Sequence, residues 1–145
     1  MKRKIITNYL FSDLFTRFKV FFRTEEIHES KFLYDIAFGF MPRSFDPVNN
    51  YDKLLFDEED EVSEMYFGIE GKVGVGFTLN GRRLDSKQYK IGKYFKKYFL
   101  LCDHYVLNNK RCEFLYLVMS PVKCFALSKK FIHKQIFPKY PEIAS

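Results

Sequence analysis

The chain has 145 residues, which suits one domain with a single core. Aromatic residues make up 19% of it, with 18 Phe, 10 Tyr and no Trp, and this favours a sheet-rich core lined with rings. The formal net charge is +6, although residues 57–70 hold seven carboxylates and no Lys or Arg. No apolar run is long enough to span a membrane, no secretory signal follows Met1, and the three cysteines form no CxxC pair.

The first predicted element is an amphipathic helix over residues 8–22. Apolar side chains recur there at steps of three and four residues, with polar residues between them. Six large apolar groups on one face exceed what a small domain readily covers. We therefore expect a contact with another protein subunit through Phe11, Phe15, Phe18 and Phe22, with packing on the same domain as the alternative.

A second helix is predicted from Ser30 to about Phe40, with Pro42 just beyond its end. These two helices divide the chain into an N-terminal helical segment, residues 1–40, which has the position of a linker, and a second part, residues 41–145. The second part begins where the hydrophobic pattern changes from helical spacing to short strands.

Short strands with turn residues between them are expected from Met41 to Leu127. They include Met65 to Ile69 and Lys72 to Phe77 around a turn at Gly71, and a hairpin at Asn80-Gly81. Ser128 is predicted to cap a last helix that ends near Phe137. Helices that flank a run of strands indicate an α+β fold, an antiparallel β-roll of the jelly-roll type with N-terminal helices and a C-terminal helix.

Several motifs occur in one order along this part of the chain. They are residues 54–77, with Met65-Tyr-Phe-Gly-Ile69 and Gly71-Lys-Val-Gly-Val75; then Gly92-Lys-Tyr-Phe-Lys-Lys-Tyr-Phe-Leu-Leu101; Lys110-Arg-Cys112; Cys124-Phe-Ala-Leu-Ser128; and Tyr140-Pro-Glu-Ile143. Together they resemble the cyclic-nucleotide-binding domain family over most of the chain, from Asp35 to Ile143. The resemblance implies the β-roll of that family.

The resemblance also implies a phosphate cassette at residues 92–101, where the family has Gly-x-x-Phe-Gly-Glu. In the family, an Arg and the N–H groups of a short helix hold the phosphate, and the Glu accepts the ribose 2′-hydroxyl. Here the matching positions are Lys96 for Gly, Lys97 for Glu, Arg111 for the Arg, and Cys112 for a hydroxyl residue, and the short helix is expected to begin near Lys97 or Tyr98. The ammonium group of Lys97 cannot accept a hydrogen bond from the ribose hydroxyl, and the side chain of Lys96 crowds the backbone that would approach the phosphate. We therefore predict weak or absent binding of cyclic AMP or cyclic GMP.

Three further stretches narrow the resemblance to the divergent domains of ciliate potassium channels. They are Met41-Pro-Arg-Ser-Phe-Asp-Pro47, residues 57–64 and Asn109-Lys-Arg-Cys-Glu-Phe-Leu-Tyr116. In that group the domain follows the membrane pore on the cytosolic side after a helical linker. The resemblance thus implies a cytoplasmic regulatory module at the cytosolic face of a membrane or within a larger assembly.

Catalysis and metal binding find no support in the residue pattern. The histidines His28, His104 and His133 are scattered, the acidic run lacks the spacing of a calcium loop, and no serine or cysteine has an evident base partner. We predict no enzyme activity, no metal site and no catalytic residue. Three classes stay open: a regulatory channel module, an assembly subunit that uses a degenerate roll as a protein-interaction platform, and a nucleic-acid binder, the weakest because no such motif accompanies the charge.

Overall fold

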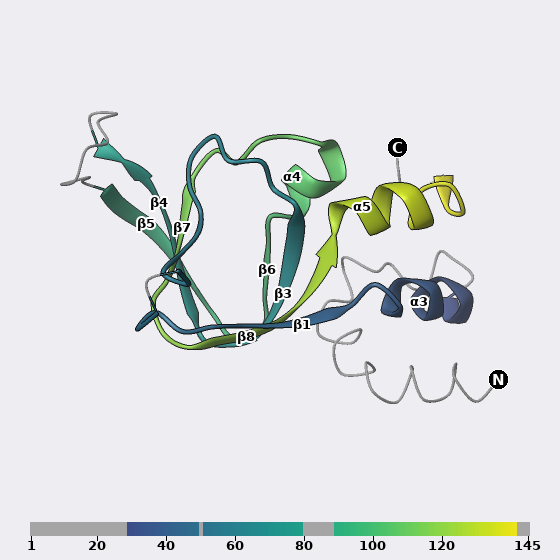
Figure 1. The fold of residues 1–145 in the computed structure, drawn as a ribbon, viewed down its shortest axis with the longest axis horizontal. Helices are drawn as coiled ribbons and strands as arrows, with labels where there is room; N and C mark the ends of the chain where they lie inside the picture. The colour runs from purple at the N-terminus through teal and green to yellow at the C-terminus, as the bar shows by residue number, and fades with distance from the viewer. Residues whose placement is uncertain (1–28, 50, 80–88, 142–145) are drawn as a thin grey trace.

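The computed structural model describes residues 29–49, 51–79 and 89–141, and within them eight strands form two antiparallel sheets (Figure 1). One sheet has the order β1 (Met41–Phe45), β8 (Val122–Ser128), β3 (Glu64–Glu70), β6 (Phe99–Leu101). The other has the order β2 (Leu54–Phe56), β7 (Leu115–Val118), β4 (Lys72–Thr78), β5 (Tyr89–Lys96). The predicted α+β roll is therefore confirmed.

The β3–β4 connection links the two sheets through one left-handed residue. Gly71 has φ 109°, and a Cβ there would lie 2.5 Å from the carbonyl oxygen of Pro121. Only glycine combines that backbone conformation with so close an approach of another segment. The turn predicted at Gly71 is thus present, between strands that closely match the predicted ones.

Strand β3 is buried on both faces, which explains why five consecutive residues without a charge, Met65 to Ile69, form its centre. The ring of Phe67 meets Phe40 edge-on at 5.6 Å between centroids, on the side of the helices. The ring of Tyr66 lies 6.0 Å from that of Phe56, which comes from the other sheet. A strand with both faces covered reads as a continuous apolar run rather than an alternating one.

The helices before and after the strands lie together at one end of the roll, as Figure 1 shows. They are α3 (Glu29–Ala37), which ends earlier than predicted, and α5 (Lys129–Phe131) with the π-helical stretch η3 (Ile132–Ile136). The hydroxyl of Ser128 accepts the N–H of Phe131 at 3.0 Å, so the predicted cap of the last helix is confirmed.

Two predicted elements lie outside the described residues, and both stay predictions. They are the phenylalanine-rich helix, residues 8–22, with Phe11, Phe15, Phe18 and Phe22, and the hairpin at Asn80-Gly81. In the part of the chain that is described, no helix combines the length and the apolar character that crossing a membrane requires.

Candidate functional site

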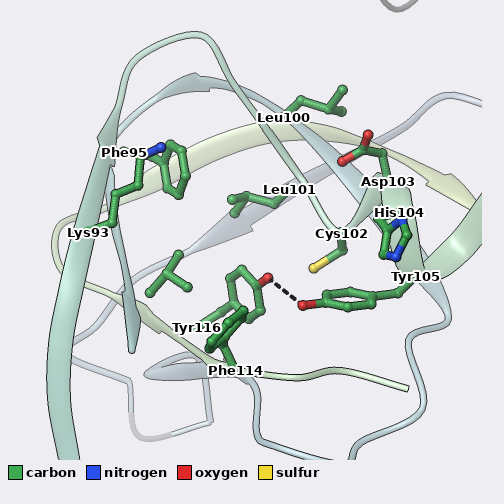
Figure 2. A pocket seen from close by; sticks show the side chains of 11 residues that line it. Lys93, Phe95, Leu100, Leu101, Cys102, Asp103, His104, Tyr105, Phe114 and Tyr116 are labelled. Atoms are coloured by element: carbon green, nitrogen blue, oxygen red, sulfur yellow. Dashed lines mark hydrogen bonds between the residues drawn. The ribbon is translucent and has the colours of Figure 1, made fainter. Parts of the chain in front are cut away.

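A cavity of about 260 Å³ opens between the second sheet and the segment that follows β5 (Figure 2). Its walls are mostly apolar and aromatic, with a few charged or polar groups among them. The lining residues are Val75, Lys93, Phe95, Leu100, Leu101, Cys102, Asp103, His104, Tyr105, Phe114 and Tyr116. Concave, largely apolar sites with a few placed polar groups are typical of small-molecule binding.

One wall comes from the start of a short helix, α4 (Asp103–Asn108), and its position corrects the sequence-based expectation. The helix expected near Lys97 or Tyr98 is absent, because both residues turn the chain with φ values of 45° and 59° and lead into β6. The helix begins at Asp103, after Cys102 in the left-handed conformation at φ 69°. A carboxylate, rather than an ammonium group, therefore stands at the helix start.

Two opposite charges face the cavity from different walls. Figure 2 places Lys93 and Phe95 on one side, and Asp103 and His104 on the other. The Nζ atom of Lys93 lies 4.9 Å from the centroid of the Phe95 ring, a cation–π distance. Asp103 is partly buried, and among the described residues its carboxylate has no hydrogen bond or ion pair.

The aromatic floor of the cavity holds two tyrosines joined by their hydroxyl groups. The hydroxyl of Tyr116 donates to that of Tyr105 at 3.3 Å, and both residues are buried. Burial raises the pKa of Tyr116, and the bond to Tyr105 adds to this effect. Burial also raises the pKa of the Cys102 thiol beside them, so all three groups are uncharged near neutral pH.

His104 presents one defined donor at the rim. The Nδ2 amide of Asn108 donates to the main-chain oxygen of His104 at 2.9 Å, and it lies 3.1 Å from the ring Nδ1. An amide nitrogen acts only as a hydrogen-bond donor, so Nδ1 is the acceptor, and in the neutral ring the proton is on Nε2. The exposed edge of His104 is thus a hydrogen-bond donor.

The four residues predicted to form the phosphate cassette lie elsewhere. Arg111 donates to the main-chain oxygen of Glu59 at 3.0 Å and pairs with the Glu61 carboxylate at 3.2 Å, while 60% of its side chain is exposed. Cys112 is buried, with its thiol donating to the oxygen of Phe114 at 2.8 Å.

Lys96 and Lys97 have other surroundings. Lys96 is exposed and stands opposite Lys72 in the β4–β5 ladder, while the Nζ of Lys97 lies 5.4 Å from the Tyr98 ring centroid. None of Lys96, Lys97, Arg111 and Cys112 lines the cavity. Their role in ligand binding stays a prediction.

Sequence reasoning missed the groups that do line it. The sequence does contain a signal for the helix α4. An acidic residue such as Asp103 often occupies the first turn of a helix, and Asn109, in the left-handed conformation, ends this helix. Lys93 and Tyr116 gave no signal, because only the sheet brings them to one cavity. Within the described ranges, no cluster of three metal-ligating side chains is present.

Comparison with known proteins finds similarity at the level of the fold but not of the sequence. No model of a known protein family matches it, and no curated protein sequence does so either. Among solved structures it is similar to the regulatory domain of Toxoplasma gondii PKA with cAMP, with a TM-score of 0.62 and 10% identity over 92% of this chain and 45% of that one. It is also similar to the regulatory subunit of a cAMP-independent protein kinase A from Trypanosoma brucei, with a TM-score of 0.64 and 19% identity over 90% of this chain and 43% of that one.

A third similar structure is the catabolite activator protein of Thermus thermophilus, with a TM-score of 0.57 and 16% identity over 76% of this chain and 46% of that one. The chain spans less than half of the length of each of these proteins. At these identities the likeness concerns the fold, which is that of cyclic-nucleotide-binding regulatory domains.

Proposed function

We propose that the chain is a non-catalytic regulatory module, similar to the cytosolic domain of a potassium channel, that binds cyclic AMP or cyclic GMP weakly or not at all. Residues 1–40 would then be the linker-like segment and residues 41–145 the regulatory roll, located in the cytoplasm at the membrane face or in a larger assembly. The shared fold and the ordered family motifs support the regulatory class. The narrower motifs support the channel context.

One observation carries the proposal of weak nucleotide binding: the guanidinium of Arg111 lies outside the cavity lining. It donates to Glu59 and Glu61 instead, and Asp103 places a negative charge at the start of α4. A phosphate diester entering there would meet a like charge without the bidentate partner that such groups favour. Leaving a buried phosphate without its partner costs on the order of 1–3 kcal/mol or more.

Calorimetric titration of the full chain with cyclic AMP and with cyclic GMP, at low and at moderate salt, tests this proposal. We expect at most weak heats with both, and no change in the Arg111→Ala variant. Any residual attraction by the surrounding lysines is screened, so it should fall as ionic strength rises. Tight binding that is insensitive to salt and is abolished by Arg111→Ala would overturn the proposal.

A specific surface feature supports a second candidate, a protein-interaction platform for other subunits. The β1–β2 loop exposes 88% of Val48 and 94% of Tyr51. The main chain of both residues is hydrogen-bonded to side-chain oxygens, because the N–H of Val48 donates to Asp46 and the N–H of Tyr51 donates to Asn49, both at 3.0 Å. Exposed apolar side chains on such a backbone suit a protein contact.

Light scattering of the full chain tests this second candidate. Self-association that is lost in the Val48→Ser, Tyr51→Ser double variant would support a contact through the loop between copies. A monomer at high concentration, with no difference between the two proteins, would count against it.

A further inference from the structure

The cavity at α4 has the charge balance of a site for a neutral molecule. Asp103 contributes one negative charge and Lys93 one positive charge, from opposite walls. Resting on the proposed loss of phosphate recognition, we propose that this cavity binds an uncharged, planar heteroaromatic ligand with hydroxyl or amino groups at one end. This is the chemistry of a nucleoside without its phosphate.

The donor end of the ligand is set by Asp103. Its carboxylate is acceptor-only when ionised, and no described residue donates to it. A pair of neighbouring hydroxyl groups can donate to its two oxygens, which a phosphate cannot do. Hydrogen bonds to an ionised acceptor are about twice as strong as those between neutral groups, so this contact favours hydroxyl-bearing ligands.

The acceptor end is set by the opposite wall. The ammonium of Lys93 has three protons to donate, and it sits over the Phe95 ring rather than in an ion pair. The ring nitrogens and exocyclic oxygen of a heteroaromatic ligand are acceptors that this group can reach without a change in net charge. His104 adds the Nε2 donor at the rim.

The walls and the size of the cavity define the rest of the ligand. Phe95, Phe114 and Tyr116 offer ring faces and edges, which bind flat π-systems well. A volume of about 260 Å³ lies just below the usual range for sites of drug-sized molecules, roughly 300–1,000 Å³. A compact ligand made of one heteroaromatic ring system and one sugar suits a space of this size better than a larger molecule does.

Titration of the full chain with adenosine, guanosine, cyclic AMP and cyclic GMP tests the inference. We expect at least one nucleoside to bind about tenfold or more tightly than its cyclic nucleotide, with an affinity that is insensitive to ionic strength. Asp103→Asn should weaken nucleoside binding at least about tenfold and Asp103→Glu should retain it, because the carboxylate is the acceptor. Lys93→Met should also weaken it.

Glu70→Gln is the matched control, since it makes the same chemical change on an exposed residue that does not line the cavity, and we expect unchanged binding. A circular dichroism spectrum checks that each variant is folded. If neither nucleoside binds while the cyclic nucleotides are also weak, this inference is wrong and the proposed function stands. If a cyclic nucleotide binds tightly, and more tightly than both nucleosides, both are overturned.

Discussion

The hydroxyl of Tyr140 donates to the Asp35 carboxylate at 2.7 Å and so joins the helix before the roll to the segment after it, across 105 positions. The Nζ atom of Lys139 approaches the same oxygen at 3.6 Å. The Asp35 side chain is only 14% exposed, so the Tyr140 hydroxyl replaces hydrogen bonds that water would otherwise donate to this carboxylate. The two ends of the described chain are therefore fastened to each other as well as to the sheets.

Tyr140→Phe should lower the free energy of unfolding by about 1–3 kcal/mol. The substitution keeps the ring but removes a hydrogen bond to a charged, mostly buried acceptor. Urea unfolding of the full chain at neutral pH measures the change. Lys139→Met offers a control, since the Lys139 side chain is 57% exposed and its longer, partly solvated contact with Asp35 should contribute less than about 1 kcal/mol. Equal effects for the two variants would contradict this account.

Gly68→Ala should destabilise the fold by about 1–3 kcal/mol, because the added methyl group would overlap the Phe99 ring. Phe99 is buried opposite Gly68 in the β3–β6 pair and has little room to move. Gly92→Ala is the control, since the nearest atom to its new Cβ would be the Val75 oxygen at 4.0 Å. That variant should stay within about 0.5 kcal/mol of the parent. Thermal unfolding compares the two.

The ion pair between Arg43 and Glu64 should show a coupling energy of about 1 kcal/mol. The Nε and Nη2 atoms of Arg43 both donate to the carboxylate, at 3.1 and 3.3 Å, and Glu64 is 15% exposed. A double-mutant cycle with Arg43→Met and Glu64→Gln measures it.

The same cycle with Arg111→Met and Glu61→Gln serves as the comparison. Those side chains are 60% and 80% exposed, so solvent screens the pair and the coupling should be near zero. A larger coupling for the exposed pair than for the one at Glu64 would show that burial does not decide the strength of these contacts.

Stability should fall between about pH 9 and pH 11, because burial raises the pKa of the thiols. Burial raises the pKa of Cys112 from 9.0 to about 11 and that of Cys124 from 9.0 to about 12. In this window the unfolded chain releases thiol protons that the folded chain keeps, and the release favours unfolding. Each such thiol contributes a slope of up to about 1.4 kcal/mol per pH unit.

Urea unfolding at several pH values from neutral to about pH 11 measures the slope. Cys124→Ala removes one of these groups and should give a shallower decline, whatever its effect at neutral pH. An identical slope in the parent and the variant would mean that Cys124 ionises equally readily in both states.

The sequence predicted the elements whose cues are local. Gly71 ends one strand and starts another because its backbone conformation suits almost no other residue, and Ser128 caps the last helix with its own side chain. The strands predicted on either side of Gly71, Met65 to Ile69 and Lys72 to Phe77, follow equally local cues and are present as β3 and β4. These features depend on neighbours along the chain, and they were read correctly.

The cavity could not be predicted in the same way. Lys97 and Tyr98 take left-handed conformations that glycine favours, and neither residue type signals such a turn. The family pattern placed the helix there, six residues before its true start at Asp103. The lining also combines Lys93 from β5, Asp103 from α4 and Tyr116 from β7, whose proximity arises only from the sheet register.

The pairing of β1 with β8 decides how the roll responds to mechanical tension. The two strands are antiparallel, and Met41 at the start of β1 stands opposite Ala126 near the end of β8. Chain entering through α3 and chain leaving through α5 therefore pull on the same end of this ladder, where Figure 1 shows both helices. Such a pull loads the hydrogen bonds of the ladder one after another, in an unzipping geometry, instead of loading them all at once in shear. Once the Tyr140–Asp35 bond has broken, we expect such a pull to open the roll from its helical end.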